Sequence, residues 1–180
     1  PQKEKERFNK KAHNTIQSVA QIGDHPHIHK VWVIQNDLGD IIEGSEWSET
    51  GTLRDLMLNN NHVFQAAYAL NICYGIARAL NEAHKAGVIH RAVKPENILM
   101  MNDMPKLMNF DLAYQLEDNR LTVIEDASKL KDDGYIAPDI IFGQDIDEST
   151  DFFSLGVIAY ELLTGEKPFN SVKQFVEQNG

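Results

Sequence analysis

The chain has 180 residues, 42% of them apolar, which suits one water-soluble core, and it carries a formal net charge of −10. Its 27 acidic residues outnumber 17 basic ones, so no nucleic-acid partner is expected, because phosphate attracts clustered Lys and Arg. No apolar run approaches the ~18 residues of a membrane helix, and the charged start of the chain is not a signal peptide. The single cysteine, Cys73, cannot form an internal disulfide, so we expect a cytoplasmic protein without a membrane partner.

The first 45 residues combine one helical pattern with two strand patterns. Apolar residues at steps of three and four predict an amphipathic helix over residues 3–22, and Gly23 ends it. Strand patterns cover residues 28–34 and 40–45, and the segment 36–39 between them predicts a hairpin turn. A helix followed by a hairpin is therefore expected here.

The rest of the chain has mostly helical patterns. Residues 52–59 predict a short helix, and residues 63–86 carry apolar positions on more than one face, which predicts a central, buried helix. An apolar run over residues 151–163 predicts a second buried helix, closed by Gly165. One strand pair followed by mostly helix indicates the α+β class. Two short strands and a charged loop are predicted at residues 98–101, 106–108 and 111–134.

Several motifs occur in a fixed order. Residues 90–99 read H-R-A-V-K-P-E-N-I-L, which resembles the protein-kinase catalytic loop H-R-D-L-x-x-x-N. Twelve residues after Asn97 comes N-F-D at 109–111, where kinases carry D-F-G. A-P-D at 137–139 stands in the place of A-P-E, and residues 150–157 resemble the kinase helix that opens with an Asp and continues through Ser-Leu-Gly.

Two upstream segments extend the resemblance. Residues 46–53 resemble the hinge between the kinase lobes, and residues 25–28 resemble the turn after the helix that kinases call αC. The resemblance implies a protein kinase-like fold, present as a partial domain from αC to the end of the αF region. It is mostly the helical C-lobe with a remnant of the N-lobe sheet. The implied parts are an N-lobe remnant, a hinge and a C-lobe, at residues 1–45, 46–52 and 53–180.

The residues that carry phosphoryl transfer in kinases depart from the pattern. Kinases use an Asp to accept the substrate proton and two metal ions to neutralise charge. Ala92 replaces that proton-accepting Asp, and a methyl group accepts no proton. Asn109 replaces the metal-binding Asp of D-F-G, so affinity for a hard cation should fall. Asp111 replaces the Gly of the same motif and adds a carboxylate that could partly restore metal binding.

Two catalytic-loop residues remain as vestiges. The resemblance implies that Lys94 would contact the transferred phosphate and that Asn97 would ligate the second metal. Their structural alternatives are a solvated cation at Lys94 and a loop-holding amide at Asn97. The set that could ligate a metal, at low affinity, is Asn97, Asn109 and Asp111.

Two further positions lack the expected kinase residue. The αC glutamate would fall near Thr15 or Ile16, where the chain has no acid. The threonine that precedes A-P-E and bonds the catalytic Asp is replaced by Asp132. Both absences are consistent with a site that does not catalyse.

The packing positions, in contrast, keep their family residues. His90 and Phe110 resemble the buried spine that links the lobes, and Asp151 resembles the helix Asp that anchors the catalytic-loop backbone. We expect Asp151 to cap its own helix as well, because a carboxylate suits a helix N-terminus. The retained packing residues and lost charged groups indicate a scaffold.

The nucleotide side of the site is reduced. By resemblance, Glu46 and Trp47 form the hinge, Leu99 forms the floor under adenine, and Ser45 is a small gatekeeper that would leave a back pocket open. The Gly-rich loop and the V-A-I-K strand of kinases do not occur in the sequence. No cofactor is therefore expected, and Mg-ATP should bind weakly at best.

The resemblance implies a catalytically impaired kinase-like domain, a pseudokinase that acts as a regulatory or protein-binding module. Its partner would be another protein or another domain of the same chain. The alternative is an active or weakly active serine/threonine kinase that uses unusual residues, such as Asp111 and Glu96. A deliberately inactivated variant of a kinase is a further alternative, because Ala92 alone could be an Asp→Ala change.

Overall fold

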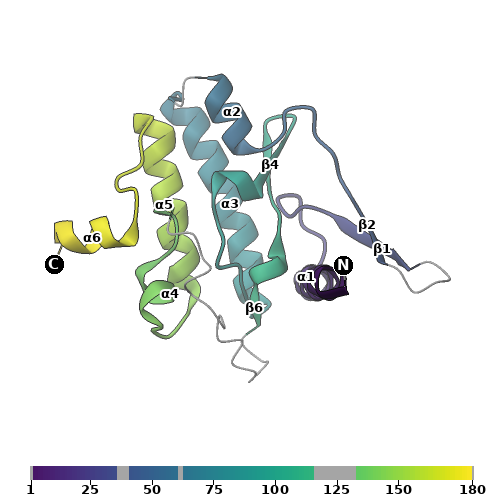
Figure 1. Ribbon diagram of the computed structural model, residues 1–180. Helices are drawn as coiled ribbons and strands as arrows, with labels where there is room; N and C mark the ends of the chain where they lie inside the picture. The colour runs from purple at the N-terminus through teal and green to yellow at the C-terminus, as the bar shows by residue number, and fades with distance from the viewer. Residues whose placement is uncertain (1, 36–40, 61–62, 116–132, 180) are drawn as a thin grey trace.

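The computed structural model describes residues 2–35, 41–60, 63–115 and 133–179. Two long helices, α3 (Ala66–Lys85) and α5 (Glu148–Thr164), lie side by side at its centre (Figure 1). Helix α1 (Gln2–Ile22) and a small hairpin lie together on one side of this pair, and α6 (Val172–Asn179) lies on the other. The described residues form mostly helices and three two-stranded sheets, which confirms the predicted α+β class.

The N-terminal part forms the predicted helix and hairpin. Helix α1 ends before Gly23, whose φ of 84° suits glycine. Strands β1 (Val31–Gln35) and β2 (Ile41–Ser45) pair antiparallel. β1 begins three residues later than predicted, because Ile28 bridges to Leu107 of another sheet instead of to β2. The predicted turn at 36–39 lies outside the described residues.

Helix α2 (Leu53–Asn59) agrees with the predicted range. Thr52 is its N-cap, and its hydroxyl accepts a hydrogen bond from the backbone N–H of Asp55. The Asp55 carboxylate accepts one in return from the Thr52 backbone N–H, at 2.8 Å, which completes a capping box. This reciprocal pair explains why the helix begins where the sequence predicts.

Helix α3 buries one face only. Its buried side packs on α5 and on strand β5, and Gly75 allows the close approach, since a Cβ there would lie 2.7 Å from Pro105. Leu70 and Tyr74 are 61% and 65% exposed. The prediction of a helix buried on more than one face was therefore wrong on that side. The buried face of the helix consists of Ala69, Ile72, Gly75, Ile76, Ala79, Leu80, Ala83 and His84.

Two short sheets and two 3₁₀ turns frame the loops between α3 and α4. Strand β4 (Ile98–Met101) was predicted correctly, and its partner β5 (Met104–Leu107) starts earlier than predicted. Strands β3 (Val88–Ile89) and β6 (Tyr114–Gln115) pair antiparallel. They were not predicted, because a strand of only two residues is too short to show an alternating pattern. The turns are η1 (Pro95–Asn97) and η2 (Phe110–Leu112).

The C-terminal part contains α4 (Pro138–Phe142), α5 and α6. Helix α5 begins three residues before the predicted start, and its N-cap is Asp147, whose carboxylate accepts a bond from the Ser149 N–H at 2.8 Å. The expectation that Asp151 caps this helix was therefore wrong. The helix is also not buried all round, because Phe152 and Tyr160 are 44% and 48% exposed.

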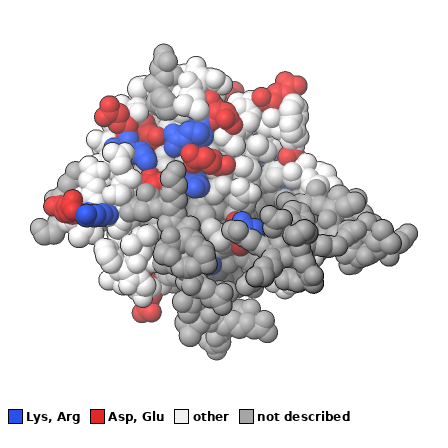
Figure 2. Space-filling model, in the orientation of Figure 1, with Lys and Arg blue, Asp and Glu red and all other residues white. Residues whose placement is uncertain are grey.

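The surface of the described residues carries both signs of charge. Figure 2 shows lysines and arginines interleaved with acidic side chains on the upper part of one face. Within the ranges that the structure describes, no helix has the length and apolar character needed to span a membrane.

Candidate functional site

A cleft of about 240 Å³ lies where the H-R-A loop, the N-F-D segment and residues 133–136 meet. The predicted catalytic-loop positions and the predicted metal positions all line it, whereas the hinge residues do not. The lining residues are Arg91, Ala92, Val93, Lys94, Asn97, Asn109, Asp111, Leu112, Asp133, Tyr135, Ile136 and Ser154.

His90 is the buried support under the catalytic loop. Its Nδ1 accepts a bond from the Ala92 backbone N–H at 3.2 Å, so its Nε2–H donates to the Met108 carbonyl at 2.9 Å. This arrangement requires the neutral ring, and complete burial lowers the pKa of His90 although Asp151 acts in the opposite direction. The ring also packs edge-on against Phe110, at 4.6 Å between centroids.

Asp151 ties the catalytic loop to α5. Its side chain is fully buried, and its oxygens accept bonds at 2.8 Å from the backbone N–H groups of His90 and Arg91. The Nε2 of His84 lies 2.8 Å from the same carboxylate. This is the anchoring contact that the kinase resemblance implies for Asp151.

The two amide residues of the site are bonded to each other. Asn97 Nδ2 donates to the Ala92 carbonyl at 2.7 Å, which leaves its Oδ1 to accept a bond from Asn109 Nδ2 at 2.8 Å. Asn109 has left-handed backbone angles, φ 63° and ψ 60°, which Asn tolerates better than most residues do. The loop-holding role considered for Asn97 is therefore present in its hydrogen bonds.

Asp111 is paired with a cation from α1. Lys11 Nζ donates to Asp111 Oδ2, and the Asn14 amide donates to the backbone carbonyl of Asp111 at 2.9 Å and to that of Ala113 at 3.2 Å. Sequence reasoning did not identify Lys11 or Asn14. Their spacing of three residues, which places them on one face of a helix, was the available signal.

Lys94 is paired with a carboxylate across the cleft. Its Nζ lies 3.1 Å from Asp133 Oδ2, and its side chain is 33% exposed. The solvated cation considered for Lys94 is thus partly exposed and bonded to a carboxylate. Gly134 positions Asp133, because its φ is +83° and an added Cβ would lie 2.5 Å from the Phe169 carbonyl. Asp132, predicted at the threonine position, lies outside the described residues.

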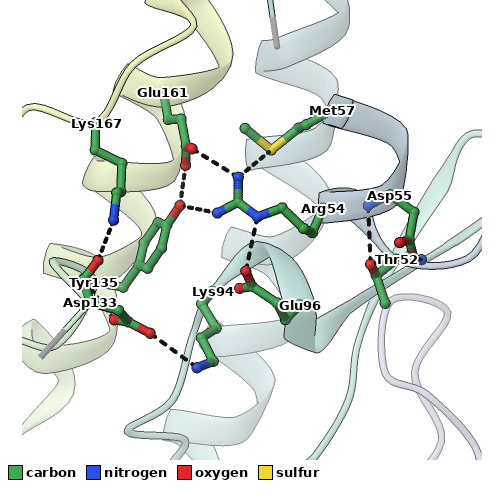
Figure 3. Close-up of polar contacts among 10 residues, drawn as sticks. All are labelled: Thr52, Arg54, Asp55, Met57, Lys94, Glu96, Asp133, Tyr135, Glu161 and Lys167. Atoms are coloured by element: carbon green, nitrogen blue, oxygen red, sulfur yellow. Dashed lines mark hydrogen bonds and ion pairs between the residues drawn. The ribbon is translucent and has the colours of Figure 1, made fainter. Parts of the chain in front are cut away.

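A partly buried ionic network lies beside the cleft (Figure 3). Arg54 on α2 donates to Glu96 and to Glu161, each at 2.9 Å, and also contacts the Tyr135 hydroxyl, which donates to Glu161. Burial opposes the charge of Arg54, but its bonds to Glu161 and Glu96 raise its pKa overall. Burial and the bond to Glu161 raise the pKa of Tyr135. The network joins α2, α5 and the segment before α4.

The predicted hinge residues lie apart from this cleft. The Glu46 carboxylate bonds to Lys106 Nζ at 2.7 and 2.8 Å and to the Lys30 backbone N–H at 3.0 Å. Trp47 is 76% exposed, whereas Leu99 is 8% exposed. Ser45, at the predicted gatekeeper position, is exposed.

The N-lobe position of the absent glutamate has no acidic replacement. Thr15 is 7% exposed and Ile16 is half-buried, so both pack against the rest of the molecule. Elsewhere in the described ranges, no three His, Cys, Asp or Glu side chains gather closely enough to hold a metal ion.

Comparison with known proteins identifies the family to which the chain belongs. The protein kinase domain model matches residues 1–179. A probable serine/threonine-protein kinase of Streptomyces coelicolor is 32% identical over 167 residues, which are 90% of this chain and 24% of that protein. The serine/threonine-protein kinase PknB of Mycolicibacterium smegmatis is 36% identical over 125 residues, 69% of this chain and 20% of that protein. This chain thus spans a quarter or less of the length of these two relatives. It belongs to the protein kinase family.

Proposed function

We propose that this protein is a catalytically impaired member of its family, which acts as a regulatory or protein-binding module. The observation that carries the proposal is the methyl group of Ala92 in the cleft, at the position of the proton-accepting Asp. Losing a general base alone typically lowers a rate by ~10²- to 10⁴-fold. The neighbouring Asn97 and Asn109 amides, bonded to each other, offer neither a base nor a charged metal ligand.

The main alternative is an active kinase that recruits an unusual carboxylate. The two candidates considered for that role are both engaged elsewhere, since Asp111 pairs with Lys11 and Glu96 bonds to Arg54 at 2.9 Å. Asp133, which also lines the cleft, pairs with Lys94. A carboxylate whose oxygen already bonds to a cation of the same chain is not positioned to accept a proton from a substrate hydroxyl. These contacts favour the impaired reading.

The proposal extends to ligands and partners. The predicted hinge residues do not line the cleft and Asn109 is neutral, and both observations support weak Mg-ATP binding at most. A partner would be another protein or another domain of the same chain, in the cytoplasm. The anchored scaffold around Asp151 and Arg54 supports such a role, because it holds the loops in place without needing a substrate.

The test is incubation of the purified protein with labelled ATP, Mg²⁺ or Mn²⁺, and generic protein substrates. We expect no label in the protein or in the substrates. Two variants keep the test specific: Asp111→Asn removes the carboxylate of the alternative, and Asp145→Asn changes an exposed acid that does not line the cleft. Label transfer by the unaltered protein that Asp111→Asn abolishes and Asp145→Asn preserves would overturn the proposal.

A further inference from the structure

In active relatives, metal ions lie between the Asp of D-F-G and the Asn of the catalytic loop. The residues of this site do not fit such an ion. The Ala92 carbonyl can only accept, so it fixes the Asn97 amide with Nδ2 toward itself and Oδ1 toward Asn109. Asn109 then presents a donor, its Nδ2, to the one Asn97 atom that could have ligated a metal.

Asp111, the other predicted metal ligand of the N-F-D segment, also has a partner within the chain. Asp111 Oδ2 accepts from Lys11 Nζ, an ammonium that carries the positive charge a cation would bring. Asn14, one helical turn further along α1, donates to the backbone carbonyls of Asp111 and Ala113. Lys11 and Asn14 together attach α1 to the N-F-D segment.

We infer that the N-F-D segment is held by donors from the chain itself, the Asn109 amide and the Lys11 ammonium, in place of divalent cations. The conformation of the N-F-D segment and the packing of α1 against it are then independent of metal. This inference deepens the proposed function and rests on it in one respect: a fixed site without metal suits a binding module better than a catalyst.

A consequence distinguishes this arrangement from a merely weakened metal site. Replacing Asn109 by Asp would put a carboxylate oxygen where the donor now lies, 2.8 Å from Asn97 Oδ1. Two acceptors at that distance repel each other, unless a cation comes between them. Asn109→Asp should therefore make the stability of the protein depend on metal, which the unaltered protein should not show.

The experiment is thermal unfolding in EDTA and in millimolar Mg²⁺ or Mn²⁺. The unaltered protein should have the same midpoint in all three. Asn109→Asp should unfold about 5 °C lower in EDTA, from the loss of one partly buried hydrogen bond and the new repulsion, and should recover with Mn²⁺. Asn59→Asp, at the exposed end of α2, adds the same charge and should show no response to metal.

Two more variants keep the inference falsifiable if Asn109→Asp does not fold in EDTA. Asn109→Ala should be destabilised equally with and without metal, because it loses the donor and adds no ligand. Adding Lys11→Gln to Asn109→Asp should lower the Mn²⁺ concentration at half-response severalfold, since Asp111 becomes available. Stabilisation of the unaltered protein by Mn²⁺, or an Asn109→Asp variant with unchanged stability and no metal response, would overturn the inference. Either result would leave the phosphoryl-transfer test unaffected.

Discussion

Replacing Asp151 by Ala should destabilise the fold more than any catalytic-loop substitution. The Asp151 carboxylate receives bonds at 2.8 Å from the His90 and Arg91 backbone N–H groups and lies 2.8 Å from His84 Nε2, all in the interior. Each buried donor left without an acceptor costs ~1–3 kcal/mol.

We expect the variant to lose about 4 kcal/mol, near the lower end of the roughly 3–9 kcal/mol that three such buried donors would give. For a chain of this size, each kcal/mol lowers the unfolding midpoint by roughly 2–4 °C, so the shift should be about 8–16 °C. Asp147→Ala is the matched control, because it removes the exposed N-cap of the same helix and should cost much less. Lys94→Ala breaks a partly exposed ion pair that is worth ~0–1 kcal/mol.

The assay is urea and thermal unfolding of the three variants beside the unaltered protein. The expected order of loss is Asp151→Ala first by a wide margin, then Asp147→Ala, then Lys94→Ala. A midpoint for Asp151→Ala within error of Asp147→Ala would refute the reasoning, because Asp151 would then contribute no more than a surface cap. Its bonds to a segment 60 residues away would then add nothing measurable to the free energy of unfolding.

Three other outcomes are expected. Arg54→Ala should cost about 3 kcal/mol in urea unfolding, because it strands the buried Glu161 carboxylate, and Arg54→Lys should recover less than half, since one ammonium cannot reach both acids. Burial depresses the pKa of His90 in the folded state below the ~6.5 of the unfolded chain, so stability should fall as pH drops from 7 to 5. A His90→Phe variant should show a shallower fall, and an unchanged slope would count against this assignment. Calorimetry should detect no Mg-ATP binding in the low micromolar range, and a dissociation constant in that range would contradict the proposed site.

The parts of the fold that the sequence predicted are those with local chemical signals. Gly23, the Thr52 capping box and Gly165 mark helix ends through interactions within a few residues. The parts that it missed depend on distant pairing. The strands Val88–Ile89 and Tyr114–Gln115 exist because they pair with each other, and β1 starts late because Ile28 pairs with Leu107.

The site divides in the same way. The kinase resemblance located Lys94, Asn97 and Asn109, and the structure brings all three to one cleft. The contacts between distant charged side chains were not predictable, because Lys11 and Asp111 are 100 residues apart and Arg54 and Glu161 are 107 apart. No local pattern encodes which charged side chain meets which across such separations. The pairing of Lys94 was missed for the same reason, since only the fold places Asp133 opposite it.

The residues that hold this fold together are buried, whereas the residues at the kinase catalytic positions line the cleft. His90, Phe110 and Asp151 are at most 1% exposed, and removing any of them would leave unpaired donors or a cavity in the core. Ala92 and Asn109 lie instead at the wall of the cleft, half-buried and exposed, where a smaller or neutral side chain strands no interior group. The catalytic carboxylates of a kinase serve the substrate and the metal rather than the core. Under the proposed function, their replacement would remove phosphoryl transfer and leave the anchoring contacts of His90, Phe110 and Asp151 in place.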